Sequence, residues 1–389
     1  MNYTDLFSAD TFNFMKSPTR EIFKKVDLSK IYSFAGGYPD PQTFPLEQMQ
    51  ELTQKVVEKY GSKALQYGGT MGVPELVKAI AKRYDVDEKN ILVSTSSQQG
   101  IDVCTRVLID PGDVILTVAP TYLGAIQSFK SYRAEIVCLD MTPSFQAASI
   151  RRETVRNLVA AGKKIKFFYS IPDFQNPSGE TLTLAQRSEL VALAREFNFL
   201  IVEDAPYREL RYEGNNVSSI YSLAPERTLH LGSFSKIFAP GLRLGWIIGP
   251  EEVLDRIYTC KQSLDLCAPV FSQYLATEYL ESGMLDKNLE KSIELYRDKR
   301  DYLIGLLEKY MPEGVTWTHP EGGLFIFVHF PENVNTVELY PRALENEVAY
   351  VAGSFFYADG SHTNTMRLNF SFMPKEKMEE GIKRLASLL

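Results

Sequence analysis

The sequence predicts an α/β fold: a mainly parallel, seven-stranded sheet sandwiched by helices, followed by a smaller α+β domain at the C-terminal end. Two observations predict it. Short, β-rich apolar segments alternate with helix-like segments through the middle of the chain, which is the pattern of parallel strands joined by crossover helices. Several of these segments are apolar almost throughout, as expected for strands that are covered on both faces.

The candidate strands follow one another at short intervals. They occupy residues 90–94, 113–118, 134–139, 165–169, 199–203, 228–232 and 245–249. The segment 184–197 (LAQRSELVALAREF) places its apolar residues on one stripe and its charges on the other side, which predicts an amphipathic helix. About a dozen residues separate the last two candidates, so the last one could be an antiparallel member of a mixed sheet.

The pattern changes after about residue 270. A long helical stretch rich in Leu, Glu, Lys and Arg is predicted from Pro269 to about Tyr310, and an amphipathic helix is predicted at the C-terminus. Shorter apolar segments lie between them, at 324–328, 348–353 and 366–372. We therefore predict three parts, namely an irregular N-terminal arm (1–45), a large domain (46–270) and a small domain (271–389).

The composition favours a cytoplasmic globular protein without a nucleic-acid or membrane partner. Of the 389 residues, 44% are hydrophobic and 23% charged, and the net charge is −7, whereas nucleic acids and anionic membranes attract basic surfaces. No apolar run approaches the ~20 residues that a membrane span needs, and no secretory signal is found. The four cysteines form no Cys-x-x-Cys pair and the four histidines lie far apart, so neither a disulfide framework nor a metal site is predicted.

Polar side chains follow five of the candidate strands. Open α/β sheets bind ligands beyond the carboxyl ends of their strands, so these side chains are expected at one edge. They are Ser97 and Gln98 after the first strand, Tyr122 after the second, Asn176 after the fourth, Asp204 and Tyr207 after the fifth, and Ser233, Ser235 and Lys236 after the sixth.

Lys236 and Asp204 carry the most specific chemistry in this set. Burial and nearby cations make an amine such as that of Lys236 neutral and nucleophilic, so that it can form a Schiff base with an aldehyde or a ketone. A carboxylate such as Asp204 can keep a pyridine nitrogen protonated, which makes the ring an electron sink, and Tyr207 is close enough to serve the same ring. The alternatives are a solvated lysine and a carboxylate that caps a turn.

Several hydroxyl and amide groups predict an anion site. Ser97 and Gln98 stand where a strand gives way to a helix, whose backbone N–H groups suit a phosphate. Ser233 and Ser235 add hydroxyl donors, and Arg243 could add charge-assisted hydrogen bonds. For the serines, an ordinary helix-capping role is the alternative.

Three further residues are candidates for binding a planar ring or a carboxylate. Tyr122 could stack on a ring, or it could be a core aromatic residue. Asn176 could donate to a ring oxygen or to a substrate carboxylate, or it could be a turn residue. Arg367 lies in a strand-like apolar run, where an arginine needs a carboxylate from the protein or from a substrate.

Together these residues resemble the class I/II aminotransferases of fold type I, which use pyridoxal 5′-phosphate (PLP). The resemblance rests on the motifs STSSQQGID, SIPDFQNPSG, VEDAPYREL, SFSKIFAPGLRLGW and NTMRLNFS. The motifs FAGGYPDPQTFP, LQYGGTMG and FQNPSG resemble the branch of 2-aminoadipate and kynurenine aminotransferases. The similarity extends from about Arg20 to the C-terminus, and it implies a PLP-binding large domain and an arm that contributes to substrate closure and to the small domain.

Position by position, the resemblance implies a role for each residue of the cofactor site. Lys236 matches the lysine that holds PLP covalently as a Schiff base, and Asp204 matches the partner of the pyridine nitrogen. Tyr207 and Asn176 match the pair that hydrogen-bonds the phenolic oxygen of the ring, and Tyr122 matches the stacking aromatic residue. The residues that match the phosphate shell are Ser97, Gln98, Ser233, Ser235 and Arg243.

The resemblance also implies how the substrate and a second subunit take part. Arg367 matches the clamp for the substrate α-carboxylate, with Asn176 beside it, and Gly36 and Arg20 match substrate-binding positions of the arm. Tyr67 matches a tyrosine that reaches the phosphate of the neighbouring subunit. A homodimer with shared active sites is therefore expected.

The implied activity is that of a PLP-dependent aminotransferase, which moves an amino group from an L-amino acid to a 2-oxo acid, with 2-oxoglutarate as the expected acceptor, in a ping-pong reaction. The amino donor stays open among 2-aminoadipate, kynurenine, aromatic and branched-chain amino acids, because the arm sequence around Arg20 departs from the family. Ser96 departs too, since it stands where the family often has glycine.

Three alternatives to this activity are kept. A lyase, a decarboxylase or a cyclopropane-forming synthase could use the same cofactor on the same fold. A PLP-binding sensor domain without turnover is less favoured, because no helix-turn-helix precedes the core. A nicotinamide oxidoreductase is weaker still, because no G-x-G-x-x-G opens a helix after a strand.

Overall fold

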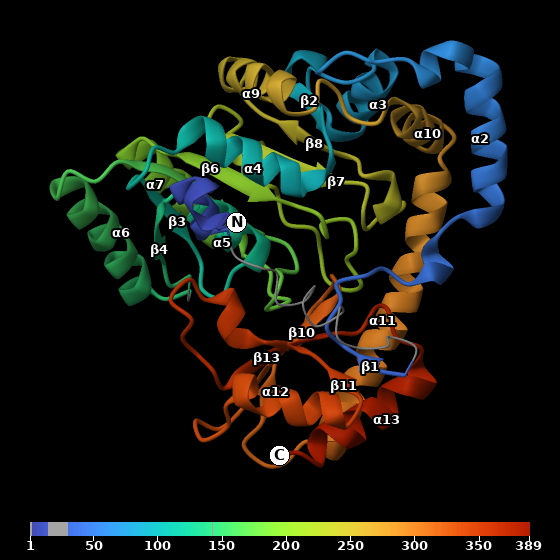
Figure 1. The fold of residues 1–389 in the computed structure, drawn as a ribbon. Coiled ribbons are helices and arrows are strands. Elements are labelled where there is room, and N and C mark those ends of the chain that lie inside the picture. The colour runs from blue at the N-terminus through green and yellow to red at the C-terminus, as the bar shows by residue number, and fades with distance from the viewer. Residues whose placement is uncertain (1, 15–29, 142) are drawn as a thin grey trace.

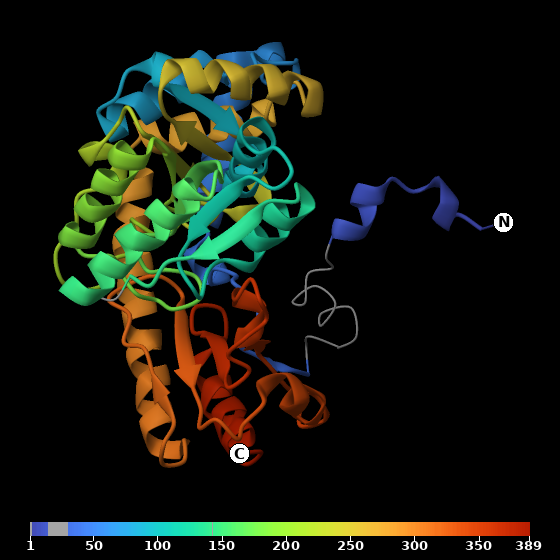
Figure 2. The ribbon, with the colours of Figure 1, turned by 90° about the vertical axis from the view of Figure 1, so that its left-hand side faces the viewer.

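The computed structural model describes residues 2–14, 30–141 and 143–389. Figure 1 shows a larger upper part built around one sheet and a smaller lower part that holds the C-terminal end. The 27-residue helix α11 (Met284–Tyr310) runs from the upper part into the lower one (Figures 1 and 2). Residues 2–14 lie outside both parts, where η2 (Ala9–Asn13) contacts α5 (Leu123–Ser131).

The central sheet has seven strands in the described part of the chain. Their order across the sheet is β2 (Ile91–Ser94), β8 (Gly245–Ile248), β7 (Thr228–Ser233), β6 (Leu200–Asp204), β5 (Ile165–Ser170), β3 (Val114–Thr117) and β4 (Glu135–Cys138). β8 is antiparallel to both of its neighbours, and the other pairs are parallel. The predicted mainly parallel sheet is therefore confirmed, and its last strand along the chain is the antiparallel member.

Helices cover both faces of this sheet. Along β5, Phe167 and Tyr169 pack in one core cluster and Phe168 packs in another, because successive side chains of a strand point to opposite faces. The predicted helix 184–197 is α7, which begins with a capping box formed by Thr183 and Gln186. The other helices before α11 are α2 (Leu46–Tyr60), α3 (Pro74–Tyr84), α4 (Ser96–Leu108), α6 (Phe145–Ala160), α8 (Ile220–Leu223), α9 (Glu251–Leu264) and α10 (Val270–Glu281).

The smaller part contains a four-stranded antiparallel sheet. Its strands lie in the order β12 (Val351–Ala352), β13 (Thr365–Asn369), β10 (Phe325–His329) and β9 (Thr316–Trp317). The last helices are α12 (Thr336–Glu345) and α13 (Lys375–Ala386), and α13 packs against α11. β1 (Tyr32–Ser33) forms a separate parallel pair with β11 (Val348–Ala349). The segment near the N-terminus is therefore bound to the C-terminal part of the chain.

One predicted element differs in the structure. The single helical stretch predicted from Pro269 to Tyr310 is two helices, α10 and α11. The chain breaks at Gly283, whose φ of +71° lies in the left-handed region that glycine adopts without steric cost. The helical periodicity was correct on both sides of the break.

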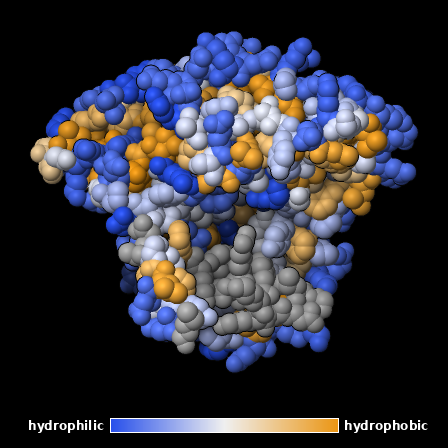
Figure 3. Space-filling view, turned by 45° about the horizontal axis from the view of Figure 1, so that its top comes forward, coloured by the Kyte–Doolittle hydropathy of each residue, from blue (hydrophilic) through white to orange (hydrophobic). Residues whose placement is uncertain are grey.

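Exposed apolar side chains gather in patches on the larger part. Figure 3 shows hydrophobic patches there among mainly hydrophilic surroundings. Leu46 begins α2, Leu65 ends the short helix η4 (Gly61–Leu65), and Tyr67 lies two residues beyond it. These residues are 72%, 82% and 80% exposed. Among the described residues, no helix combines the length and the apolar character needed to cross a membrane.

Candidate active site

The candidate site lies at the carboxyl edge of the central sheet. β5, β6 and β7 are neighbouring parallel strands that end at Ser170, Asp204 and Ser233. Lys236 follows β7 in a turn, and Asn176 follows β5 in a loop. Because parallel strands end at the same edge, the fold brings these side chains to the place where α/β proteins bind ligands.

Asp204 is a buried carboxylate with one satisfied and one unsatisfied oxygen. The residue is 2% exposed, and the Tyr169 hydroxyl donates a hydrogen bond of 2.8 Å to its Oδ2. Its Oδ1 is also buried but has no hydrogen-bond partner among the described residues. Burial raises the pKa of Asp204 to about 7, although the Tyr169 hydrogen bond acts in the opposite direction. An acceptor in this state suits a ligand that brings an N–H donor, because an unpaired buried acceptor is costly.

Lys236 is held in a setting that favours its neutral amine. Its Nζ donates a hydrogen bond of 2.6 Å to the carbonyl oxygen of Gly37. Burial of the amine, followed by the positive charges of Arg367 and Arg243, lowers the pKa of Lys236 to about 8. A substantial fraction of this amine is therefore unprotonated slightly above neutral pH, as a nucleophile or general base requires.

Arg367 is a buried cation that no described carboxylate neutralises. It is 3% exposed on β13, and its guanidinium donates to Asn176 Oδ1 at 2.8 Å and to the Ala35 carbonyl oxygen at 2.5 Å. The aromatic rings of Phe325 and Phe356 lie 4.2 and 5.1 Å from the guanidinium carbon. Its Nε is buried without a partner among the described residues, and burial lowers the pKa of Arg367 to about 10. The guanidinium is placed to donate hydrogen bonds to a ligand carboxylate.

The segment 35–37 connects these two cations. The Ala35 carbonyl oxygen accepts from Arg367 and the Gly37 carbonyl oxygen accepts from Lys236. Gly36 is buried between them, so the structure brings this predicted residue to the site. Arg20, the other arm residue predicted to bind substrate, lies outside the described residues.

The predicted anion site forms where α4 begins. Ser96 has a φ of +73°, and the Arg243 guanidinium donates a hydrogen bond of 2.7 Å to its Oγ. Gly245 of β8 permits this turn, because a Cβ at this position would lie 2.8 Å from the Ser96 carbonyl carbon. Ser97 and Gln98 follow in the first turn of α4, and across the same edge Ser233 Oγ accepts from the backbone N–H of Ser235 at 3.1 Å.

Two tyrosines contact residues of this group. Tyr122 donates from its hydroxyl to Gln98 Oε1 at 3.1 Å. Tyr207 is 5% exposed, and burial raises the pKa of its phenol, while a hydrogen bond with Asn176 acts against that shift. Tyr67 is not brought together with them within this chain, since its side chain is 80% exposed on the surface.

The sequence analysis missed Tyr169, and it did not predict the partner of Ser96. Tyr169 is the last apolar residue of β5 and is fully buried, so the pattern alone indicates a core residue. Its position, directly before the polar edge, was the signal that could have identified it. Ser96 was noted as a departure from glycine, and its contact with Arg243 became visible only in three dimensions.

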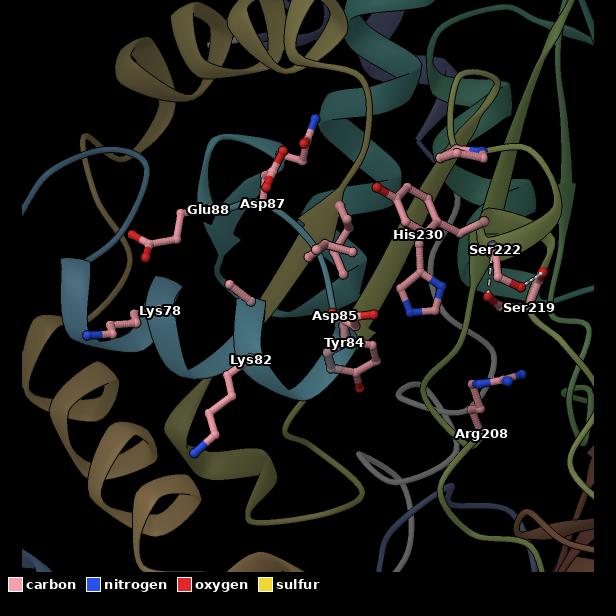
Figure 4. Close-up of a pocket in the computed structure, with 16 residues that line it drawn as sticks. Lys78, Lys82, Tyr84, Asp85, Asp87, Glu88, Arg208, Ser219, Ser222 and His230 are labelled. Carbon is pink, nitrogen blue, oxygen red and sulfur yellow. Dashed lines mark hydrogen bonds between the residues drawn. The ribbon is translucent and has the colours of Figure 1, made fainter.

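A cavity of about 850 Å³ lies elsewhere, near the C-terminal end of α3 (Figure 4). Tyr84, Arg208 and His230 line it. Nδ1 of His230 lies 2.9 Å from Oε2 of Glu203. Glu203 precedes Asp204 on β6, so their side chains point to opposite faces of the sheet. None of the predicted site residues that the structure describes lines this cavity.

Comparisons with known proteins agree with this geometry. Residues 34–385 match the family described as aminotransferase class I and II. The chain is 43% identical to aromatic-amino-acid aminotransferase 1 of Thermococcus litoralis, over 100% of this chain and 95% of the relative. It is 33% identical to 2-aminoadipate transaminase of Thermus thermophilus, over 100% and 98% of the two chains. The crystal structure of Pyrococcus horikoshii kynurenine aminotransferase superposes with a TM-score of 0.94 at 41% identity, and the match covers 100% of this chain and 97% of that one.

The chain belongs to the class I and II aminotransferases. It is a PLP-dependent transaminase, as the resemblance implied. Two features of the residues at the carboxyl edge fit this cofactor. The buried Oδ1 of Asp204 has no hydrogen-bond donor among the described residues, and a protonated pyridine ring would supply one. The amine of Lys236 is partly neutral and can therefore react with an aldehyde.

We expect Asp204→Asn to stabilise the cofactor-free protein at neutral pH. The pKa of this carboxyl is about 7 in the folded chain against 3.8 unfolded, so the folded state binds more protons between these values. The contribution of Asp204 to the free energy of unfolding is therefore complete below about pH 4 and is lost as pH rises through 7, by up to ~4 kcal/mol. Denaturant unfolding of the wild-type protein and of Asp204→Asn from pH 5 to 8 measures this effect. A difference between their free energies of unfolding that does not grow with pH would contradict the prediction.

Proposed function

We propose that Lys236, Asp204 and Arg367 form the catalytic centre of a transaminase that passes an amino group from an L-amino acid to 2-oxoglutarate. One observation carries this proposal above the others: the Lys236 amine and the buried Arg367 guanidinium donate to the carbonyl oxygens of Gly37 and Ala35, so both cations meet at one short segment. The Nε of Arg367 has no partner among the described residues. An α-amino acid has a carboxylate and an amine on neighbouring atoms, and this pair of side chains matches both.

Each residue then has a definite task. Bound PLP supplies an aldehyde that condenses with amines and a ring that withdraws electrons from the substrate Cα. The Arg367 guanidinium binds the α-carboxylate and fixes the orientation of the substrate. The neutral amine of Lys236 removes the proton from Cα and returns it as a general base and acid. Oδ1 of Asp204 keeps a proton on the ring nitrogen.

The remaining predicted residues are proposed to hold the cofactor. Tyr122 stacks on the ring, and Tyr207 with Asn176 binds its phenolic oxygen. The phosphate is bound at the start of α4, where the left-handed turn and the nearby guanidinium support an anion site. The residues proposed for the phosphate are Ser97, Gln98, Ser233, Ser235 and Arg243.

We also propose that the active enzyme is a cytoplasmic homodimer. Tyr67 and Leu65 are 80% and 82% exposed, and large side chains exposed together commonly mark subunit contacts. In such a dimer Tyr67 binds the phosphate in the neighbouring subunit, which explains its position away from its own site.

The amino donor is proposed to lie among those named for the relatives, namely aromatic amino acids, 2-aminoadipate and kynurenine. A panel of these donors with 2-oxoglutarate tests the proposal. Equal amounts of glutamate and of the 2-oxo acid of one donor are expected. Release of ammonia or carbon dioxide without glutamate would instead identify a lyase or a decarboxylase. A preference for an acidic donor that Arg20→Ala weakens would assign Arg20 to the substrate side chain.

A further inference from the structure

Tyr169 lies directly behind the carboxylate that faces the cofactor site. It is fully buried on β5, and its ring packs edge-on against Phe129 with a centroid distance of 5.4 Å. Its hydroxyl donates the 2.8 Å hydrogen bond to Oδ2 of Asp204. The residue was not among those predicted from the motifs, and no part of the proposed function uses it.

This contact determines which oxygen of Asp204 is available. A carboxylate rotates readily about its last bond, so two equivalent oxygens would compete for one ligand donor. The Tyr169 hydroxyl occupies Oδ2, while Oδ1 stays buried and unpartnered among the described residues. The hydrogen bond from the Tyr169 hydroxyl also favours the ionised form of the Asp204 carboxyl. His230 favours this ionised form too, whereas burial opposes it.

We propose that Tyr169 is a positioning residue for the cofactor, whose hydroxyl holds Oδ2 of Asp204 and so presents a charged Oδ1 to the protonated ring nitrogen of PLP. The proposal rests on the proposed function, because it takes Asp204 as the partner of that nitrogen. Tyr169 does not touch the cofactor itself and acts only through Asp204.

The test compares two ligands that differ at the ring nitrogen. The first is PLP, and the second is its 1-deaza analogue, in which a C–H group replaces the nitrogen. Cofactor-free wild-type protein and Tyr169→Phe are titrated with each ligand, and the quenching of tryptophan fluorescence gives the dissociation constants. Tyr169→Phe is expected to weaken PLP about tenfold and the analogue less than about twofold, because only PLP depends on a charge-assisted hydrogen bond to Asp204.

Tyr350→Phe is the matched control. Tyr350 is also fully buried and donates a hydrogen bond of 2.6 Å, but to the carbonyl oxygen of Thr336 at the start of α12. Tyr350→Phe shows the effect of removing a buried phenol hydroxyl that does not contact Asp204. It is expected to leave both dissociation constants unchanged. Thermal unfolding of the three proteins shows whether each is folded.

The outcomes separate the proposals. Equal weakening of both ligands by Tyr169→Phe, or no weakening of either, overturns the role of Tyr169. If the wild-type protein itself binds PLP no better than the analogue, the pairing of Asp204 with the ring nitrogen fails first. Should Tyr169→Phe not fold, 3-fluorotyrosine at position 169 keeps the shape and makes the hydroxyl a stronger donor. The protein with this residue must then bind PLP more tightly, relative to the analogue, than the wild-type protein does. An unchanged ratio of the two dissociation constants overturns the proposal.

Discussion

Lys236→Ala is expected to lower the transamination rate by ~10⁴-fold or more, because general acid–base catalysis alone contributes up to that factor and covalent attachment adds to it. The variant loses the amine of Lys236, whose pKa burial lowers to about 8. Single-turnover formation of the 2-oxo acid from a bound amino acid measures the effect. The variant should still fold and still bind PLP through its phosphate and its ring.

Lys236→Arg is the sharper companion of this variant. A guanidinium can keep the positive charge and the hydrogen bond to the Gly37 carbonyl oxygen, but it stays protonated at any pH of interest. It should therefore be as inactive as alanine. Activity within about tenfold of wild type in either variant would remove Lys236 from the mechanism, since general base catalysis contributes at least ~10²-fold.

Arg367→Lys should lower kcat/KM for the amino acid by about 10²- to 10³-fold, because a bidentate, charge-assisted pair with the α-carboxylate is lost. The flanking rings of Phe325 and Phe356 are shaped around a planar guanidinium, which an ammonium group cannot replace. Steady-state kinetics with the same donor for both proteins gives the ratio.

An amine without a carboxylate provides the control for Arg367. The decarboxylated counterpart of the donor should react slowly with the wild-type protein and at the same rate with Arg367→Lys. A variant that slows both donors equally would show that Arg367 supports the fold of the site and does not bind the substrate carboxylate.

The sheet and the residues at its edge could be predicted because they obey local rules. Parallel strands covered on both faces are apolar throughout, so their positions are visible in the sequence. The rule that ligands bind at the carboxyl ends of strands then groups Asp204 and Lys236 with the other polar residues of that edge, and the resemblance to the aminotransferases assigns their roles. The structure brings both residues to that edge, together with Asn176 and Arg367.

The features that could not be predicted depend mainly on contacts between segments that are distant in sequence. The carbonyl oxygens of Ala35 and Gly37 contact Arg367 and Lys236 across some 200 to 330 positions, and a backbone oxygen has no sequence signature. Tyr169 resembles any buried aromatic residue until its partner is known. The break at Gly283 was missed because one glycine is tolerated within a helical pattern.

One measurement tests the central claim most directly. The yellow, PLP-loaded protein is treated with borohydride, digested and mapped by mass spectrometry, which locates the lysine that carries the cofactor. The mass of the phosphopyridoxyl group is expected on the peptide that contains Lys236, and it should be lost in Lys236→Arg. Labelling of a different lysine, or no covalent label on a protein that is yellow and active, would contradict the assignment.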